Sequence, residues 1–89
     1  MKFKEGDKVI FNKKYIEENG LAYGGYGWVD DHIKQGNKPM TIAEVERNSD
    51  IFNSYGLIGV FNFIGYYEYF SIEENAILPY KNNIYKIGG

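Results

Sequence analysis

The sequence predicts a small, mainly β domain in which five short strands close into a barrel. Its 89 residues suffice for one hydrophobic core and are too few for two. Aromatic residues make up 18% of the chain and include nine tyrosines, which favour strands, while eleven glycines supply turns. Short runs of alternating apolar and polar residues are separated by turn residues. Closure into a barrel suits so small a sheet because it removes exposed strand edges.

The first strand is expected over residues 8–12. Val9 and Phe11 lie two positions apart and therefore share one face of this strand. A turn containing Gly6 precedes it, and glycine adopts a positive φ there without a Cβ penalty. Phe3 is expected to pack beneath that turn.

The segment after the first strand has no clean period. Residues 14–20 predict one short helical turn that ends at Gly20. Residues 21–29, rich in glycine and aromatics, predict a long ordered loop or an irregular hairpin. Residues 30–38 are polar and predict a turn region, which Pro39 ends.

The central part of the chain predicts three strands. Residues 40–46 alternate in polarity and form the second strand. Residues 57–64 are almost continuously apolar and form the third, and residues 66–70 form the fourth. Gly65 lies between these last two strands, so they are expected to pair as a hairpin.

The end of the domain predicts a short helical turn and a closing strand. Ser71 and Glu74 have the spacing of a capping box, which would begin one helical turn. Residues 76–80 form the closing strand. We therefore expect a single domain over residues 1–80, with residues 81–89 as an edge strand or a partly disordered tail.

Three short motifs carry a resemblance to a known family. They are Phe-x-x-Gly-Asp-x-Val within residues 3–12, Thr-Ile-x-Glu-Val within 40–46, and Tyr-Tyr-x-Tyr-Phe followed by Ile-Glu-Glu-Asn-Ala-Ile-Leu-Pro within 66–80. Together they resemble the SH3-like barrels of small bacterial and phage proteins. The resemblance implies a five-stranded SH3-like barrel with a long irregular loop after strand 1 and a short helical turn before the last strand. The Ala-Leu-Tyr-Asp-Tyr motif of proline-peptide-binding SH3 domains is absent, so no ligand-binding residue is carried over.

Composition narrows the location and the chemistry. The chain has no cysteine, which excludes thiolate metal sites and cysteine nucleophiles and favours a reducing compartment. It contains neither an N-terminal leader nor an apolar run of about 20 residues, the length that spans a membrane. We therefore expect a cytoplasmic protein.

No catalytic constellation is visible in the sequence. His32 is the only histidine and follows Asp30 and Asp31, but three consecutive residues in a strand point to alternating faces and make poor joint ligands. We expect His32 in a solvated turn. Because no nucleophile is paired with a base, the sequence predicts a protein that is not an enzyme and has neither a metal nor a cofactor.

The function that the sequence favours is protein–protein interaction, as in a phage or mobile-element accessory protein that modulates a host factor. Aromatic residues on loops and exposed strands are frequent interface anchors. Two interpretations of Trp28 stay open, since it can plug the barrel or anchor a partner. The candidate partner-binding residues are Tyr23, Tyr26, Trp28, Tyr66, Tyr67 and Tyr69.

The alternative is a nucleic-acid-binding protein. The net charge is −2, yet half of the ten basic residues lie in the first fourteen positions. Clustered lysines beside exposed aromatics can hold phosphates and stack bases. The candidate nucleic-acid residues are Lys2, Lys4, Lys8, Lys13 and Lys14. The apolar stretch from Leu57 to Phe70 leaves both a monomer and a homodimer open.

Overall fold

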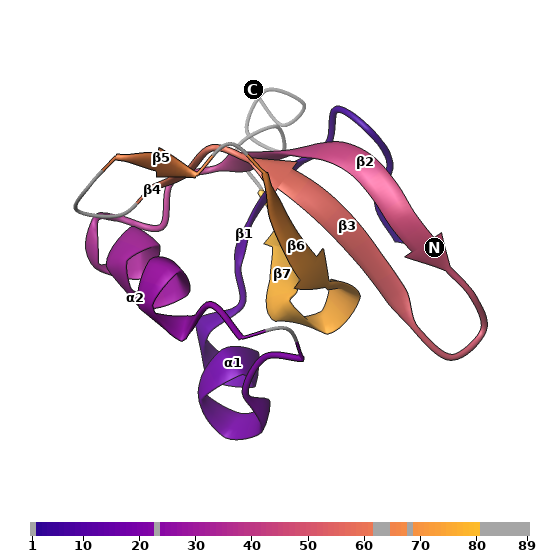
Figure 1. Ribbon diagram of the computed structural model, residues 1–89, viewed down its shortest axis with the longest axis horizontal. Helices are drawn as coiled ribbons and strands as arrows, with labels where there is room; N and C mark the ends of the chain where they lie inside the picture. The colour runs from indigo at the N-terminus through magenta and orange to yellow at the C-terminus, as the bar shows by residue number, and fades with distance from the viewer. Residues whose placement is uncertain (1, 23, 62–64, 68, 81–89) are drawn as a thin grey trace, which may run out of the picture.

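The protein is built on one antiparallel sheet. The computed structural model describes residues 2–22, 24–61, 65–67 and 69–80. The spatial order of the strands is β6-β3-β2-β1-β7 (Figure 1). Their bounds are β1 Lys8–Phe11, β2 Met40–Asn48, β3 Asn53–Ile58, β6 Phe70–Glu73 and β7 Ile77–Pro79. The first four follow one another as a meander, and β7 returns to pair with β1.

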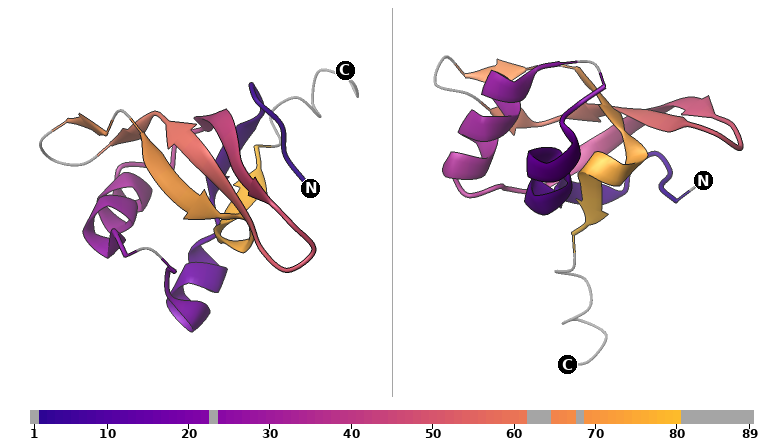
Figure 2. Two further views of the ribbon diagram at one scale, coloured as in Figure 1. Left: turned by 45° about the vertical axis from the view of Figure 1, so that its right-hand side comes forward. Right: turned by 90° about the horizontal axis from the view of Figure 1, so that it is seen from below.

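The mainly β class is therefore confirmed, whereas closure into a barrel is not. Strands β6 and β7 form the two edges of the sheet and do not pair with each other in the described residues. Two helices, α1 (Lys13–Asn19) and α2 (Tyr26–Lys34), lie beside the sheet (Figure 2). No helix in the described part of the chain is long and apolar enough to cross a membrane.

The predicted hairpin is present but interrupted. Strand β3 pairs with β6, and a two-stranded extension pairs β4 (Val60–Phe61) with β5 (Tyr66–Tyr67). The chain bends between β3 and β4 at Gly59, whose φ is +97°. The expected strand over 57–64 thus divides, and its first half begins earlier, at Asn53. The extension lies over α2 (Figures 1 and 2).

The first strand, the first helical turn and the closing strand are confirmed. Val9 and Phe11 are buried on the same face of β1, as their spacing predicts. Asn12 caps α1, accepting a hydrogen bond from the backbone N–H of Tyr15 at 3.2 Å. Gly20 ends α1 with φ +77°. The predicted tail over 81–89 lies outside the described residues.

The prediction of a loop over 21–29 followed by a polar turn over 30–38 is wrong. Helix α2 occupies much of both segments. Val29 and His32 are buried, and Ile33, four positions after Val29, is partly buried and packs against the core. Three closely spaced glycines lower the helix propensity of this segment, so propensity alone does not predict α2. Packing of one face of the helix against the core stabilises it instead.

The capping box is also wrong. Ser71 lies within β6, and its hydroxyl donates to Glu46 across the sheet at 2.8 Å. A 3₁₀ turn, η1, does follow at Glu74–Ala76, but its N-cap is Glu73, which makes no side-chain capping bond. Glu74 instead accepts a hydrogen bond from the Tyr55 hydroxyl. The turn is in the predicted place and is held by different contacts.

The core lies between the sheet and the helices. Tyr55 and Leu57 of β3 are fully buried, and Ile16 of α1 and Val29 of α2 pack into the same cluster. Phe3 is buried against the ring of Tyr55, with centroids 5.5 Å apart. The apolar faces of both helices are therefore joined to the sheet, and this fixes where the helices lie.

Candidate functional site

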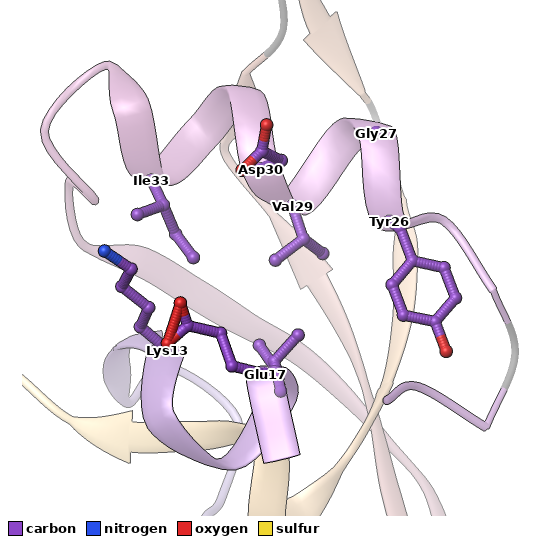
Figure 3. Close-up of a pocket in the computed structure, with 8 residues that line it drawn as sticks. Lys13, Glu17, Tyr26, Gly27, Val29, Asp30 and Ile33 are labelled. Atoms are coloured by element: carbon purple, nitrogen blue, oxygen red, sulfur yellow. The ribbon is translucent and has the colours of Figure 1, made fainter. Parts of the chain in front are cut away.

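A cleft separates α1 from α2 and is the candidate functional site. Its volume is about 380 Å³, and side chains from both helices point into it (Figure 3). The floor is apolar and the rim is charged. Its lining residues are Lys13, Ile16 and Glu17 of α1, and Tyr26, Gly27, Val29, Asp30 and Ile33 of α2.

The side chain of Tyr26 bonds the connection between the two helices. The Tyr26 hydroxyl accepts a hydrogen bond from the Leu21 N–H at 2.8 Å and lies 3.4 Å from the carbonyl oxygen of the same residue. A Cβ at Gly20 would lie only 2.6 Å from this hydroxyl, so a glycine is needed there. Tyr26 therefore fixes the end of α1 against the start of α2, although its side chain is 53% exposed.

The start of α2 requires a second glycine. Gly25 is the N-cap residue and has φ +83° in the left-handed region. A Cβ at this position would approach the ring of Phe70 to 2.9 Å. A side chain at position 25 would therefore obstruct the start of α2. The position of this helix in turn determines one wall of the cleft.

His32 fastens α2 to the sheet extension. The backbone N–H of Phe61 in β4 donates to His32 Nδ1 at 3.0 Å, so the ring proton lies on Nε2. Nε2 in turn donates to the carbonyl oxygen of Lys38 at 2.8 Å. The ring is 1% exposed and meets Phe11 edge-on, with centroids 5.2 Å apart. The prediction that His32 lies in a solvated turn is therefore wrong, because His32 is a buried, neutral core residue.

Burial is the largest cause that lowers the pKa of His32 below its usual range. The hydrogen bond to the Lys38 carbonyl acts in the opposite direction, and the charge of the Lys38 ammonium again lowers the pKa. Protonation of Nδ1 would also set a new donor against the Phe61 N–H. The neutral ring is therefore the form that holds α2 in place.

The rim of the cleft carries both signs of charge. Asp30 forms an ion pair with Lys34 one helical turn away, at 2.9 Å. This contact raises the pKa of the Lys34 ammonium. Lys13 and Glu17 lie on the facing helix, and neither forms an ion pair with another described residue. An apolar floor with a mixed polar rim has the anatomy of a protein-binding surface.

The structure does not bring the six predicted partner-binding residues together. Tyr26 lines the cleft, whereas Trp28 is partly buried and packs against the core. Tyr69 lies across the sheet, where its hydroxyl meets Glu44 and Glu46 of β2. Tyr66 and Tyr67 lie in β5, with their side chains outside the described part, and Tyr23 is not among the described residues.

The sequence missed the apolar floor of the cleft. Ile16, Val29 and Ile33 were not singled out as site residues, although the i, i+4 spacing of Val29 and Ile33 marks one face of a helix. Because His32 is also buried, the positions 29, 32 and 33 together mark the inward side of α2. Gly27 opens onto the same space, since a Cβ there meets nothing within 4 Å.

The predicted lysines are divided among several contacts. Lys4 pairs with Asp7 at 3.2 Å, and Lys8 Nζ donates to the Thr41 hydroxyl at 2.6 Å. Lys2 Nζ lies 5.9 Å from the centre of the Phe3 ring. Lys13 lines the cleft, and Lys14 is exposed on the same helix.

Asp30, Asp31 and His32 do not converge, because His32 faces the core while Asp30 faces solvent. Among the described residues no group of three histidine or carboxylate side chains could hold a metal ion.

Comparison with known proteins gives no match: no protein-family model fits the chain, and no curated protein or solved structure is significantly similar to it.

Proposed function

We propose that the protein is a small non-enzymatic binding module that holds a partner protein at the α1–α2 cleft. The observation that carries this proposal is the cleft itself, whose apolar floor is rimmed by charged side chains from two helices. The partner inserts an apolar side chain between Val29 and Ile16. Residues at the edge of the contact then meet Glu17 and Lys13 on the rim.

The chemistry of the rim favours a protein over a nucleic acid. Glu17 and Asp30 would both repel phosphate groups, and Lys4 is already paired with Asp7. If the lysines nevertheless bound a nucleic acid, the affinity would fall steeply with added salt. Protein capture at this cleft depends mainly on apolar contact, so moderate salt weakens it little.

The strand order supports an SH3-like architecture for this module. In chain order, four strands form a meander and the last returns to the first, with a 3₁₀ turn just before it. The expected SH3-like barrel has such a turn before its closing strand. The helix α2 and the β4–β5 extension are then additions to that framework, and α2 forms one wall of the binding cleft.

Gly27 allows the proposal to be tested without harming the fold. We expect Gly27→Gln to fill the cleft with a polar side chain and to reduce partner capture from a lysate of the source organism at least about tenfold, a typical cost of losing one interface anchor. Gly27→Ala is the matched control and should retain capture. Circular dichroism and the unfolding midpoint verify that both variants fold. Equal capture by both variants would contradict the assignment of the site.

A further inference from the structure

The charges on the α1 wall of the cleft are arranged along its length. Figure 3 shows Lys13 beside Ile33 at one end of the cleft and Tyr26 at the other end. Glu17 follows Lys13 by four positions, which is one helical turn or about 6 Å along α1. A segment lying along the cleft therefore meets a positive charge first and a negative charge one turn later.

Both of these charges are available to a partner. The side chains of Lys13 and Glu17 are exposed, and neither forms an ion pair or a hydrogen bond with another described residue. A lysine four positions before a glutamate is the less favourable order for a pair within one helix. Asp30 on the facing wall is already paired with Lys34 at 2.9 Å. The two unpaired rim charges are thus one ammonium and one carboxylate, both on α1.

The walls of the cleft favour a helical partner. Both walls are helices, and the backbone groups within a helix bond to one another, so an extended segment finds no strand edge to pair with. An amphipathic helix needs no such edge, because its own backbone is bonded internally and its apolar face packs into a groove. Gly27 leaves room for this face, since a Cβ there would meet nothing within 4 Å.

We infer that the cleft accepts an amphipathic helix whose apolar stripe is bordered by one acidic and one basic side chain, one turn apart. The acidic side chain meets Lys13, the basic side chain meets Glu17, and the apolar stripe covers Ile16 and Val29. This inference rests on the proposed docking at the cleft and adds the chemistry of the partner. Exposed ion pairs are individually weak, so the stripe supplies most of the affinity and the two pairs select the partner and its direction.

Selection from a displayed library of random peptides on the immobilised protein tests this inference. Peptides of about 16 residues are long enough for four helical turns. We expect the enriched peptides to share apolar residues at helical spacing, bordered by an acidic and a basic residue three or four positions apart. A proline placed between the two charged residues of a selected peptide should abolish its binding, because proline interrupts a helix.

An exchange of charges on α1 supplies matched variants. Lys13→Glu combined with Glu17→Lys should weaken binding of a selected peptide about threefold to thirtyfold, because two attractive pairs become repulsive. Exchanging the two charges of the peptide should restore the affinity. Lys14→Glu combined with Glu18→Lys is the control, since these exposed residues do not line the cleft, and it should leave the affinity unchanged. Both variants move an acid to the start of α1 and a base toward its end, so their effects on helix stability are alike.

The possible outcomes separate this inference from the proposed function. Peptides that bind Gly27→Gln as tightly as the unchanged protein would lie outside the cleft and contradict both. Peptides that lose binding to Gly27→Gln but tolerate the exchange at Lys13 and Glu17 would leave the cleft as a docking site and overturn the inference about its partner. An equal loss in the control variant, binding that survives the proline, or the absence of any enriched peptide would also overturn it.

Discussion

His32 shows how one side chain connects sequence, packing and the site. Its ring joins α2 to β4 through the Phe61 N–H and to the following loop through the Lys38 carbonyl. Because histidine counts as polar in a periodicity argument, the sequence placed it in solvent. The structure places it in the core with both ring nitrogens bonded, and this removes the cost of burying them.

Burial of a neutral His32 predicts a pH dependence of stability. The pKa of the folded-state ring is lowered, so below about pH 6.5 the unfolded chain binds a proton that the folded chain does not. The free energy of unfolding should therefore fall as the pH drops from about 7.5 to 5, and urea unfolding measures it. Carboxylates lose their contribution only at lower pH. His32→Gln should flatten the curve over this range, and an unflattened curve would show that another group titrates.

A second prediction concerns the contribution of the Tyr55 hydroxyl to stability. This fully buried hydroxyl bonds Glu74 and accepts from the backbone N–H groups of Lys2 and Phe3, each at 3.3 Å. Tyr55→Phe removes a partner of Glu74 and of the Phe3 N–H, whereas the Lys2 N–H keeps its bond to Glu74, and the free energy of unfolding should fall by about 1–3 kcal/mol in urea titrations. Tyr80→Phe is the control, since its ring is outside the buried core. An equal loss in both variants would argue against this anchoring role.

Elements whose signals are local were predictable from the sequence, and those that depend on distant contacts were not. The period of two in β1 and the glycine at the end of α1 are local, and both predictions hold. Helix α2 is stabilised by contacts with the sheet that no window of sequence contains. The cleft, which needs both helices, was therefore invisible even though Tyr26 on its edge was singled out.

The two glycines at the start of α2 predict opposite effects on stability. Gly25→Ala should destabilise the fold by about 1–3 kcal/mol, because φ is +83° and the new Cβ would meet Phe70. Gly27→Ala should stabilise it by about 0.4–1 kcal/mol, because the unfolded chain loses freedom and nothing lies within 4 Å of the new Cβ. Thermal and urea unfolding measure both. Effects of the same sign would contradict the assigned start of α2.

At the scale of the whole molecule, two different surfaces flank one sheet. The helices and the β4–β5 extension enclose the core on one side and leave the apolar cleft between α1 and α2 (Figures 1 and 3). A polar hollow of about 400 Å³ lies on β2, β3 and β6, lined by Glu46, Arg47, Ser54 and Ser71. The mainly β class was predicted from the sequence, but the position of the helices beside the sheet depends on α2, which the sequence did not predict.

The central claim is that a partner protein docks in the α1–α2 cleft, and photo-cross-linking tests it most directly. A photoreactive phenylalanine analogue at Gly27 stands at the cleft, and the same analogue at Asn48 stands at the exposed end of β2. We predict that irradiation in a lysate of the source organism yields one discrete protein adduct from position 27 and none from position 48. An adduct from position 48 alone, or none from position 27, would contradict the claim.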